Sequence, residues 1–436
     1  MAFAPSLRVF RHRAYRNYWI MRQLMTAGRQ MRAVAIGWQV YDLARLDRSV
    51  EESAFLLGLV GLVQFLPVLA LSLVGGQAAD RFDRKRIILA SNIVGFAANL
   101  LLIATAFLAP QLALPLVFVA AAVLGGVNAF FPAAGNALYP NLVPRAELSN
   151  AIAWNSLGFQ SFAIAGPALG GFLYAAGAHV VYSISALMSL LAFLVMAVTK
   201  TPKQEPIPGA DGFKMAMEGL RFVRDNKTIL GAVLLDLIVV FFAGATALLP
   251  VFARDILHVG AGGLGLLRAA PAAGAAVVAF SLATRPLQNK VGRTMLVAIV
   301  VYGAATLVFA SSTAFWLSMA ALAVTGAADM ISVYVRQSLI QFATPDAMRG
   351  RVSAVSFIFI SASNELGEFE SGVAARFLGP VGAVVLGGTV AIATAIAWIR
   401  LFPSLANADR LDAAPQVVTQ NPERIEPRAQ GAPPAS

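Results

Sequence analysis

The chain has 436 residues, of which 58% are hydrophobic and only 13% are charged. This composition lies far outside the usual range of soluble domains, and the length leaves room for about twelve membrane spans of roughly 20 residues each. Cysteine is absent and the histidines, His12, His179 and His258, are scattered, so we expect no disulfide and no metal site. The net charge of +11 does not indicate nucleic-acid binding, because no basic face with interleaved aromatic residues is present.

The first predicted span, residues 17–42, follows a basic segment at 1–16 and is unusually charged. Arg22, Arg29 and Arg32 fall at helical spacing on one narrow stripe of this span. Arg29 and Arg32 lie roughly 18 and 22 Å along the helix axis from its start, at about 1.5 Å per residue. That depth is too large for snorkelling to the membrane surface, so both are candidates for holding a substrate or taking part in proton coupling.

A charged stretch separates the second predicted span from the third. Its sequence is Gly76-Gln-Ala-Ala-Asp80-Arg81-Phe-Asp83-Arg84-Lys-Arg. Such a short basic stretch cannot cross a bilayer, and the positive-inside rule makes it a cytoplasmic turn. Its form resembles the loop signature of the major facilitator superfamily, and the aspartate in place of the second glycine is similar to the enterobactin-exporter-like branch. The resemblance implies that Asp80 and Arg81 tie one half of a transporter to the other in one conformation, and simple topological anchoring remains the alternative.

Two internal repeats indicate duplicated halves. Residues 289–293 align with Asp80 to Arg84, and residues 337–351 align with residues 136–150. Together with the loop, this repeat resembles the two six-helix bundles of the superfamily. The implied fold is an all-α membrane protein with twelve transmembrane helices in two pseudo-symmetric bundles.

The fifth predicted span, residues 148–173, contains closely spaced small residues. They are Gly158, Gly166, Pro167, Gly170 and Gly171. Small residues at this spacing let helix backbones approach closely. The stretch resembles the superfamily's Gly-Pro-x-x-Gly-Gly antiporter motif, and generic tight packing is the equally open alternative.

The predicted organisation has five parts, and Lys and Arg gather on one side of the spans. The parts are a basic cytoplasmic N-terminus at 1–16, an N-terminal six-helix bundle at 17–199, a cytoplasmic linker with an amphipathic helix at 200–227, a C-terminal six-helix bundle at 228–402 and a disordered cytoplasmic tail at 403–436. The presumed outer loops hold few basic residues, namely Arg45, Arg48, Arg254 and Arg376. This asymmetry predicts a multi-pass plasma (inner) membrane protein with both termini in the cytoplasm.

Charged residues inside the second half extend the candidate site, because charge at membrane depth is costly and indicates function. The candidates are Asp236, Asp329, Arg336, Glu365 and Glu368, with Arg268 as a further deep arginine. Glu365 and Glu368 are three residues apart and share one helix face. By depth, Glu365 can face Arg29 or Arg32 across a cavity, where such a pair either couples protons or only stabilises one conformation. In the family that the chain resembles, the spans with these charges line or flank the central cavity.

We interpret the chain as a secondary active transporter that works by alternating access, with export of a small drug- or siderophore-like molecule linked to protons. The alternatives are an uptake symporter for a small metabolite and a non-transporting membrane sensor or assembly partner. We expect no enzymatic activity and no cofactor, since neither a P-loop nor a nucleophile–base arrangement is present. The expected partners are the lipid bilayer, a small-molecule substrate and H⁺, and we expect a monomer.

Overall fold

The structure, a computed structural model, describes residues 7–202, 212–287 and 289–409, which form helices and no strand. The predicted segments at 1–6, 203–211 and 410–436 lie outside the described residues. The first half contains α1 (Arg13–Ala44), α2 (Val50–Arg81), α3 (Arg84–Thr105), α4 (Pro110–Leu138), α5 (Leu148–Tyr174) and α6 (Ala178–Ala197). The second half contains α7 (Gly212–Asp225), α8 (Lys227–Phe242), α9 (Leu249–Val251), α10 (Gly260–Thr284), α11 (Val291–Ser311), α12 (Phe315–Ala343), α13 (Asp346–Leu401) and α14 (Pro403–Ala406).

The number of membrane-crossing helices agrees with the predicted fold. In the described part of the chain, nine helical segments are long and apolar enough to cross a membrane. The long helices α1 and α5 are outside that group, and α1 carries three arginines along its length, Arg22, Arg29 and Arg32. One apolar segment, Ala362–Leu401, lies in α13, which breaks into two helices at Gly379 with a φ of 73°. With α1, α5 and both parts of α13, the arrangement is consistent with twelve transmembrane helices.

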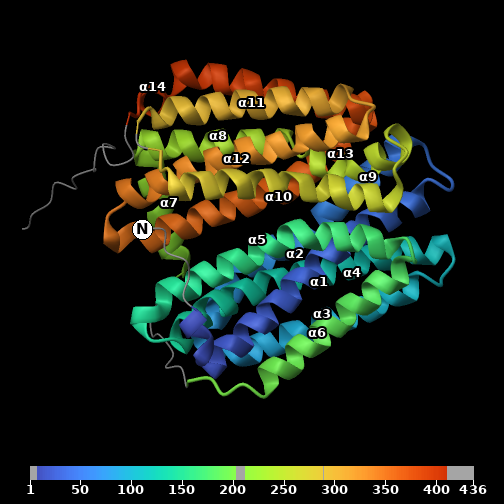
Figure 1. Cartoon of the computed structure of the whole chain (residues 1–436), viewed down its shortest axis with the longest axis horizontal. Coiled ribbons are helices and arrows are strands. Elements are labelled where there is room, and N and C mark those ends of the chain that lie inside the picture. Colours follow the sequence, from blue (N-terminus) through green and yellow to red (C-terminus); the bar gives the residue numbers. More distant parts are fainter. Residues whose placement is uncertain (1–6, 203–211, 288, 410–436) are drawn as a thin grey trace, which may run out of the picture.

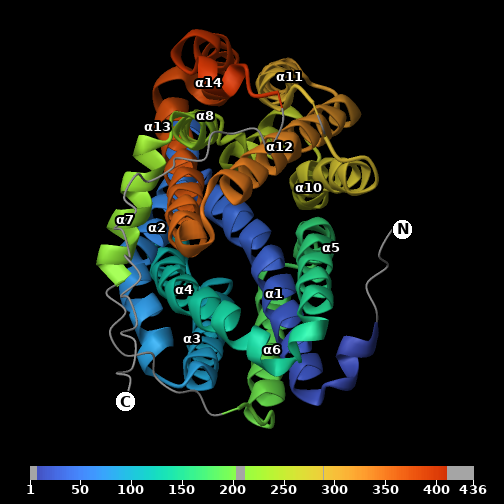
Figure 2. The same cartoon turned by 90° about the vertical axis from the view of Figure 1, so that its left-hand side faces the viewer.

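The helices form two bundles, α1–α6 and α8–α13, that lie one above the other in Figure 1. The bundles meet where α2 packs on α13 and α5 packs on α10, and Figure 2 shows both pairs side by side. We call the end of the molecule that carries α9 the α9 end, and the opposite end, which carries α7 and α14, the α7 end. In the view of Figure 1 the bundles lie together at the α9 end and diverge toward the α7 end.

Glycines make the contacts between the two bundles close. A Cβ atom added to Gly58 of α2 would lie 2.7 Å from the Cα atom of Gly372 of α13. Likewise, a Cβ atom added to Gly265 of α10 would lie 3.0 Å from the Cα atom of Gly171 of α5. Backbones can approach this closely only where side chains are missing, so these positions fix where the bundles touch.

Charged side chains join the bundles at the α9 end. Arg254, just after α9, forms an ion pair with Asp42 at the end of α1. Arg45 Nε lies 3.7 Å from a carboxylate oxygen of Asp255, and the Tyr41 hydroxyl donates a hydrogen bond to the same carboxylate. These contacts link α1 to the second bundle over and above the helix packing.

The charged loop between α2 and α3 holds several helix ends of the first bundle together. Arg84 donates hydrogen bonds to the carbonyl oxygens of Ala79 and Ala137, near the ends of α2 and α4, at 2.9 and 2.8 Å. Lys85 Nζ donates to the carbonyl oxygen of Ala197, the last residue of α6, at 2.9 Å. Cations are favourable at helix C-termini, where carbonyl groups lack partners within the helix.

The chain after α13 corrects one prediction. Residues 403–409 were predicted to be disordered, but α14 (Pro403–Ala406) is helical and the following residues bind the start of α11. The backbone N–H of Gly292 donates to the Ala408 carbonyl oxygen at 3.0 Å, and that of Lys290 donates to Asp409 Oδ1 at 3.1 Å. The polar composition hid these backbone contacts, which need no apolar periodicity.

We predict that Arg84→Gln destabilises the protein by about 2 kcal/mol, because two carbonyl oxygens lose a charged donor. The measurement is the thermal unfolding of purified protein in detergent. Arg86→Gln is the matched control, since Arg86 lies in the same loop but is exposed. Equal unfolding temperatures for the two variants would show that the Arg84 hydrogen bonds do not hold the helix ends.

Candidate functional site

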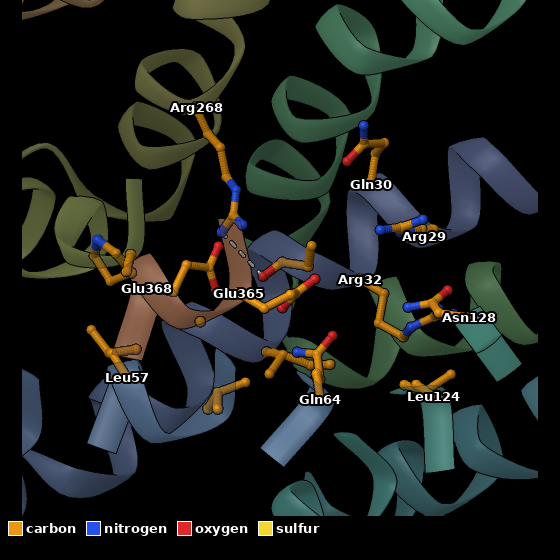
Figure 3. Close-up of a pocket in the computed structure, with 16 residues that line it drawn as sticks. Arg29, Gln30, Arg32, Leu57, Gln64, Leu124, Asn128, Arg268, Glu365 and Glu368 are labelled. Carbon is orange, nitrogen blue, oxygen red and sulfur yellow. Dashed lines mark hydrogen bonds between the residues drawn. The ribbon is translucent and has the colours of Figure 1, made fainter. Parts of the chain in front are cut away.

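A cavity of about 150 Å³ lies between the two bundles and is lined by charged side chains from both. Arg29 and Arg32 come from α1, Arg268 from α10, and Glu365 and Glu368 from α13. Figure 3 shows Arg268 extending from α10 toward the carboxylates, with the two α1 arginines on another side of the same space. We call this space the central cavity.

The three arginines of the central cavity differ in how they are held. Arg32 Nη1 donates a hydrogen bond to Asn99 Oδ1 at 3.2 Å, and Arg268 Nη1 donates to the Ala33 carbonyl oxygen at 3.4 Å. Arg29 is exposed and forms no hydrogen bond or ion pair with another described residue. Its guanidinium is therefore free to bind a molecule that enters the cavity.

The carboxylates of the central cavity are not paired directly with the arginines. Neither Glu365 nor Glu368 forms an ion pair or side-chain hydrogen bond with a described residue. The pair of Glu365 with Arg29 or Arg32 that depth made possible is thus not a direct contact, although all three residues line one cavity. Gly61 of α2 leaves room for Glu368, because a Cβ atom at Gly61 would lie 3.1 Å from its Oε2 atom.

The central cavity has an excess of positive charge. With both carboxylates ionised, three guanidinium groups face two carboxylates and leave one positive charge in excess. Interactions between charges are stronger away from bulk water because the effective dielectric constant is lower. The site therefore favours an anionic or polar guest, and protonation of either carboxylate would increase that preference.

Asp236 and Arg336 occupy a different place from the other predicted site residues. They form an ion pair inside the C-terminal bundle, with side-chain exposures of 6% and 3%. Neither residue lines the central cavity. A buried pair of this kind compensates two charges that would otherwise be costly at membrane depth.

Asp329, the remaining candidate, lines a second cavity of about 200 Å³ in the C-terminal bundle. This second cavity also contacts Glu368, so one carboxylate borders both spaces. From the family resemblance, all the deep charges were expected on helices that line or flank one central cavity. Nothing in the sequence indicated that they would be divided between two cavities.

Three uncharged polar residues of the central cavity were not predicted. Gln30, Gln64 and Asn128 come from α1, α2 and α4 and line it beside the charged groups. A search for charge alone passes over them. The available signal was an amide side chain within an otherwise apolar span, since polar groups there need a partner.

Residues of the charged loop differ in their contacts. Arg84 binds helix ends as described above, whereas Asp80 and Arg81 form no hydrogen bond or ion pair with another described residue. A Cβ atom added to Gly76 would meet nothing within 4 Å. In this conformation Asp80 makes no hydrogen bond or ion pair with a described residue of the other bundle.

The small residues of α5 face two different helices. Three of them face α1: a Cβ atom added to Gly158 would contact the side chain of Gln23, one added to Gly166 the side chain of Gln30, and one added to Gly170 the backbone of Met31. Gly171 faces α10 instead, where it approaches Gly265. Pro167 is buried, and its carbonyl oxygen lies close to Gly265. The motif thus allows close packing of α5 on α1 and on the second bundle.

Comparison with known proteins identifies the relatives of this chain. Residues 2–429 match the family described as transmembrane secretion effector. The enterobactin exporter EntS of Citrobacter koseri is 28% identical over 397 residues, covering 88% of this chain and 87% of that protein. The EntS protein of Escherichia coli O1:K1 / APEC is 26% identical over 400 residues, with coverage of 88% and 87%.

A solved structure supports the fold independently. The bacterial homologue of the iron transporter ferroportin, in an inward-facing state, has a TM-score of 0.66 at 15% identity and covers 92% of this chain and 99% of that chain. At this identity the likeness concerns the fold alone.

We predict that Asp236→Leu destabilises the protein by about 3 kcal/mol, because Arg336 is left buried without a counter-charge. The double variant Asp236→Leu, Arg336→Met should recover most of this loss, since no unpaired charge remains. Both effects are measured as unfolding temperatures in detergent.

The exposed pair Arg224–Asp225, with side-chain exposures of 74% and 63%, gives the control. Asp225→Leu should change the unfolding temperature little, as expected for surface ion pairs. A double variant no more stable than Asp236→Leu alone would exclude mutual neutralisation as the role of the buried pair.

Proposed function

The chain belongs to the transmembrane secretion effector family of the major facilitator superfamily, whose members are transporters rather than enzymes, and on that premise we propose that it is a proton-linked exporter of a small anionic molecule. The observation that carries the proposal is the central cavity, where Arg29, Arg32 and Arg268 face Glu365 and Glu368. The relatives named as enterobactin exporters support the direction of transport and a siderophore-like substrate.

The roles in this proposal follow from the contacts. Arg29, which has no protein partner among the described residues, binds the anionic group of the substrate, and Arg32 and Arg268 add to the positive field. Glu365 or Glu368 carries the proton, because an unpaired carboxylate in a partly desolvated cavity can change protonation when its surroundings change. Proton and anionic substrate then favour each other's binding electrostatically: a negative carboxylate weakens anion binding, and a neutral one strengthens it.

Alternating access is the proposed cycle, with the α7 end at the cytoplasm. Basic side chains of the charged loop lie at the α7 end, which the positive-inside rule assigns to the cytoplasm. Ion pairs join the bundles at the opposite end, while Asp80 and Arg81 have no partner among the residues that the structure describes. This combination corresponds to an inward-facing state, and in the outward-facing state we expect Asp80 to contact the second bundle.

The orientation is tested by single cysteines, for which the cysteine-free chain gives no background. Thr201→Cys, after α6, should react only with reagents that reach the cytoplasm. Gln111→Cys, at the start of α4, should react with an impermeant maleimide added to intact cells. Labelling of Thr201→Cys from outside would reverse the orientation.

The coupling role is tested in proteoliposomes with an imposed pH gradient. Flux is measured with enterobactin, the compound named for the relatives, and with small aromatic carboxylates. We expect that the double variant Glu365→Gln, Glu368→Gln loses proton-driven flux but keeps substrate exchange without a gradient, because the arginines remain. Arg29→Gln should instead weaken binding roughly tenfold, equivalent to about 1.4 kcal/mol.

Glu370→Gln is the matched control, since Glu370 lies on the same helix but does not line the central cavity. It should keep proton-driven flux. Proton-driven flux that survives in the Glu365, Glu368 double variant would remove these residues as proton carriers. Loss of exchange in that variant would mean that the carboxylates hold the substrate rather than the proton.

A further inference from the structure

The second cavity differs in charge from the central cavity. Its volume is about 200 Å³, and its charged lining residues are Asp329 of α12 and Glu368 of α13. The described residues that line it include no lysine, arginine or histidine. Tyr302, Thr306 and Phe309 of α11 add hydroxyl and aromatic groups. The cavity is therefore acidic, whereas the central cavity has an excess of positive charge.

The carboxylates of the second cavity make no direct ion pair with a described residue, although Glu368 also faces the arginines of the central cavity. Neither Asp329 nor Glu368 forms a side-chain hydrogen bond or ion pair with a described residue. Arg336, on the same helix as Asp329, is already paired with Asp236. A desolvated carboxylate without a direct partner is costly, so a cation beside Asp329 would be stabilised.

A helix end supplies a second, independent source of negative potential. Helix α8 ends at Phe242, and Val240, Ala243 and Gly244 around this end line the cavity. The C-terminus of a helix carries a partial negative charge, and interrupted helices in transporters use such ends to bind cations. Tyr302 donates its hydroxyl hydrogen to the Ala243 carbonyl oxygen at 3.2 Å, which places a further polar oxygen at the same end.

The two cavities meet at Glu368, which lines both. We propose that the second cavity is a subsite for a monovalent cationic group. The occupant is either the alkylammonium group of a transported molecule whose anionic end lies at Arg29, or an inorganic cation such as Na⁺. An alkylammonium occupant rests on the proposed function and narrows the substrate class to molecules that carry both an anionic and a cationic group. An inorganic cation as occupant does not depend on the proposed function.

The test uses three compounds with the same ring and different charge. Benzylammonium, benzoate and benzyl alcohol are added to the purified full chain at constant ionic strength, and unfolding temperature is measured. Benzylammonium should raise the unfolding temperature more than benzyl alcohol does. In Asp329→Asn this additional shift should be lost, while the shift caused by benzoate remains. In Arg29→Gln the shift caused by benzoate should be lost, while the additional shift caused by benzylammonium remains.

Controls separate the cation subsite from general charge effects and from the proposed function. Asp47→Asn removes an exposed carboxylate and should leave the benzylammonium shift intact. The unfolding temperature is also compared in NaCl and in N-methylglucammonium chloride. If Na⁺ raises it in the unmodified protein but not in Asp329→Asn, and benzylammonium has no effect, the occupant is an inorganic cation. Loss of the benzoate response alone would contradict the proposed function and leave this subsite standing.

Two results would overturn the subsite. One is a benzylammonium shift in the unmodified protein no larger than that of benzyl alcohol, together with no effect of Na⁺. The other is a cation response that is unchanged in Asp329→Asn. The first comparison needs no variant, so it decides the question even if Asp329→Asn does not fold.

Discussion

An ionised side chain within a bilayer is stable only where protein groups or water compensate its charge, and this constraint governs the arrangement of the whole molecule. Asp236 and Arg336 compensate each other directly inside one bundle. Arg29, Arg268 and Glu365 instead gather around the space between the bundles. Helix α6 shows the reverse case, since its sequence from Ala178 to Ala197 contains no Lys, Arg, Asp or Glu. Among these described residues, charge at membrane depth is thus found in a buried pair or along a cavity.

The two kinds of contact between the bundles have different physical properties. Glycine-to-glycine contacts such as Gly58–Gly372 depend on shape and van der Waals packing, which change little when the bundles rock about them. The ion pair between Asp42 and Arg254 lies at the α9 end, where it is partly exposed to solvent. Water can replace such a pair at small cost. The packing contacts can therefore act as a pivot, while the charged contacts close one end reversibly.

Much of the fold could be predicted because hydrophobic length and charge are local properties of the sequence. The predicted spans 17–42 and 148–173 overlap α1 and α5, and the amphipathic helix predicted within residues 200–227 is α7. The gathering of Arg29, Arg32, Glu365 and Glu368 could also be predicted, since helix depth follows from residue count. The pairing of Asp236 with Arg336 could not, because it depends on how α8 and α12 are rotated about their axes. The end of α8 at Phe242, beside the second cavity, could not be predicted either, because the surrounding sequence is apolar on both sides of it.

Glu368 lies directly at the contact between the two bundles, so the surroundings of its carboxylate depend on how the bundles are oriented. It lies one helical turn from Gly372, where α13 touches α2, and its carboxylate lies beside Gly61 of α2. Alternating access requires the two bundles to change their relative orientation, and α2 and α13 belong to different bundles. Rocking about the Gly58–Gly372 contact would tilt α13 relative to α2 and so alter how far the Glu368 carboxylate, beside Gly61, is desolvated. Since the proton affinity of a carboxylate depends on desolvation, this contact would link proton binding to conformation if Glu368 is the proton carrier that we propose.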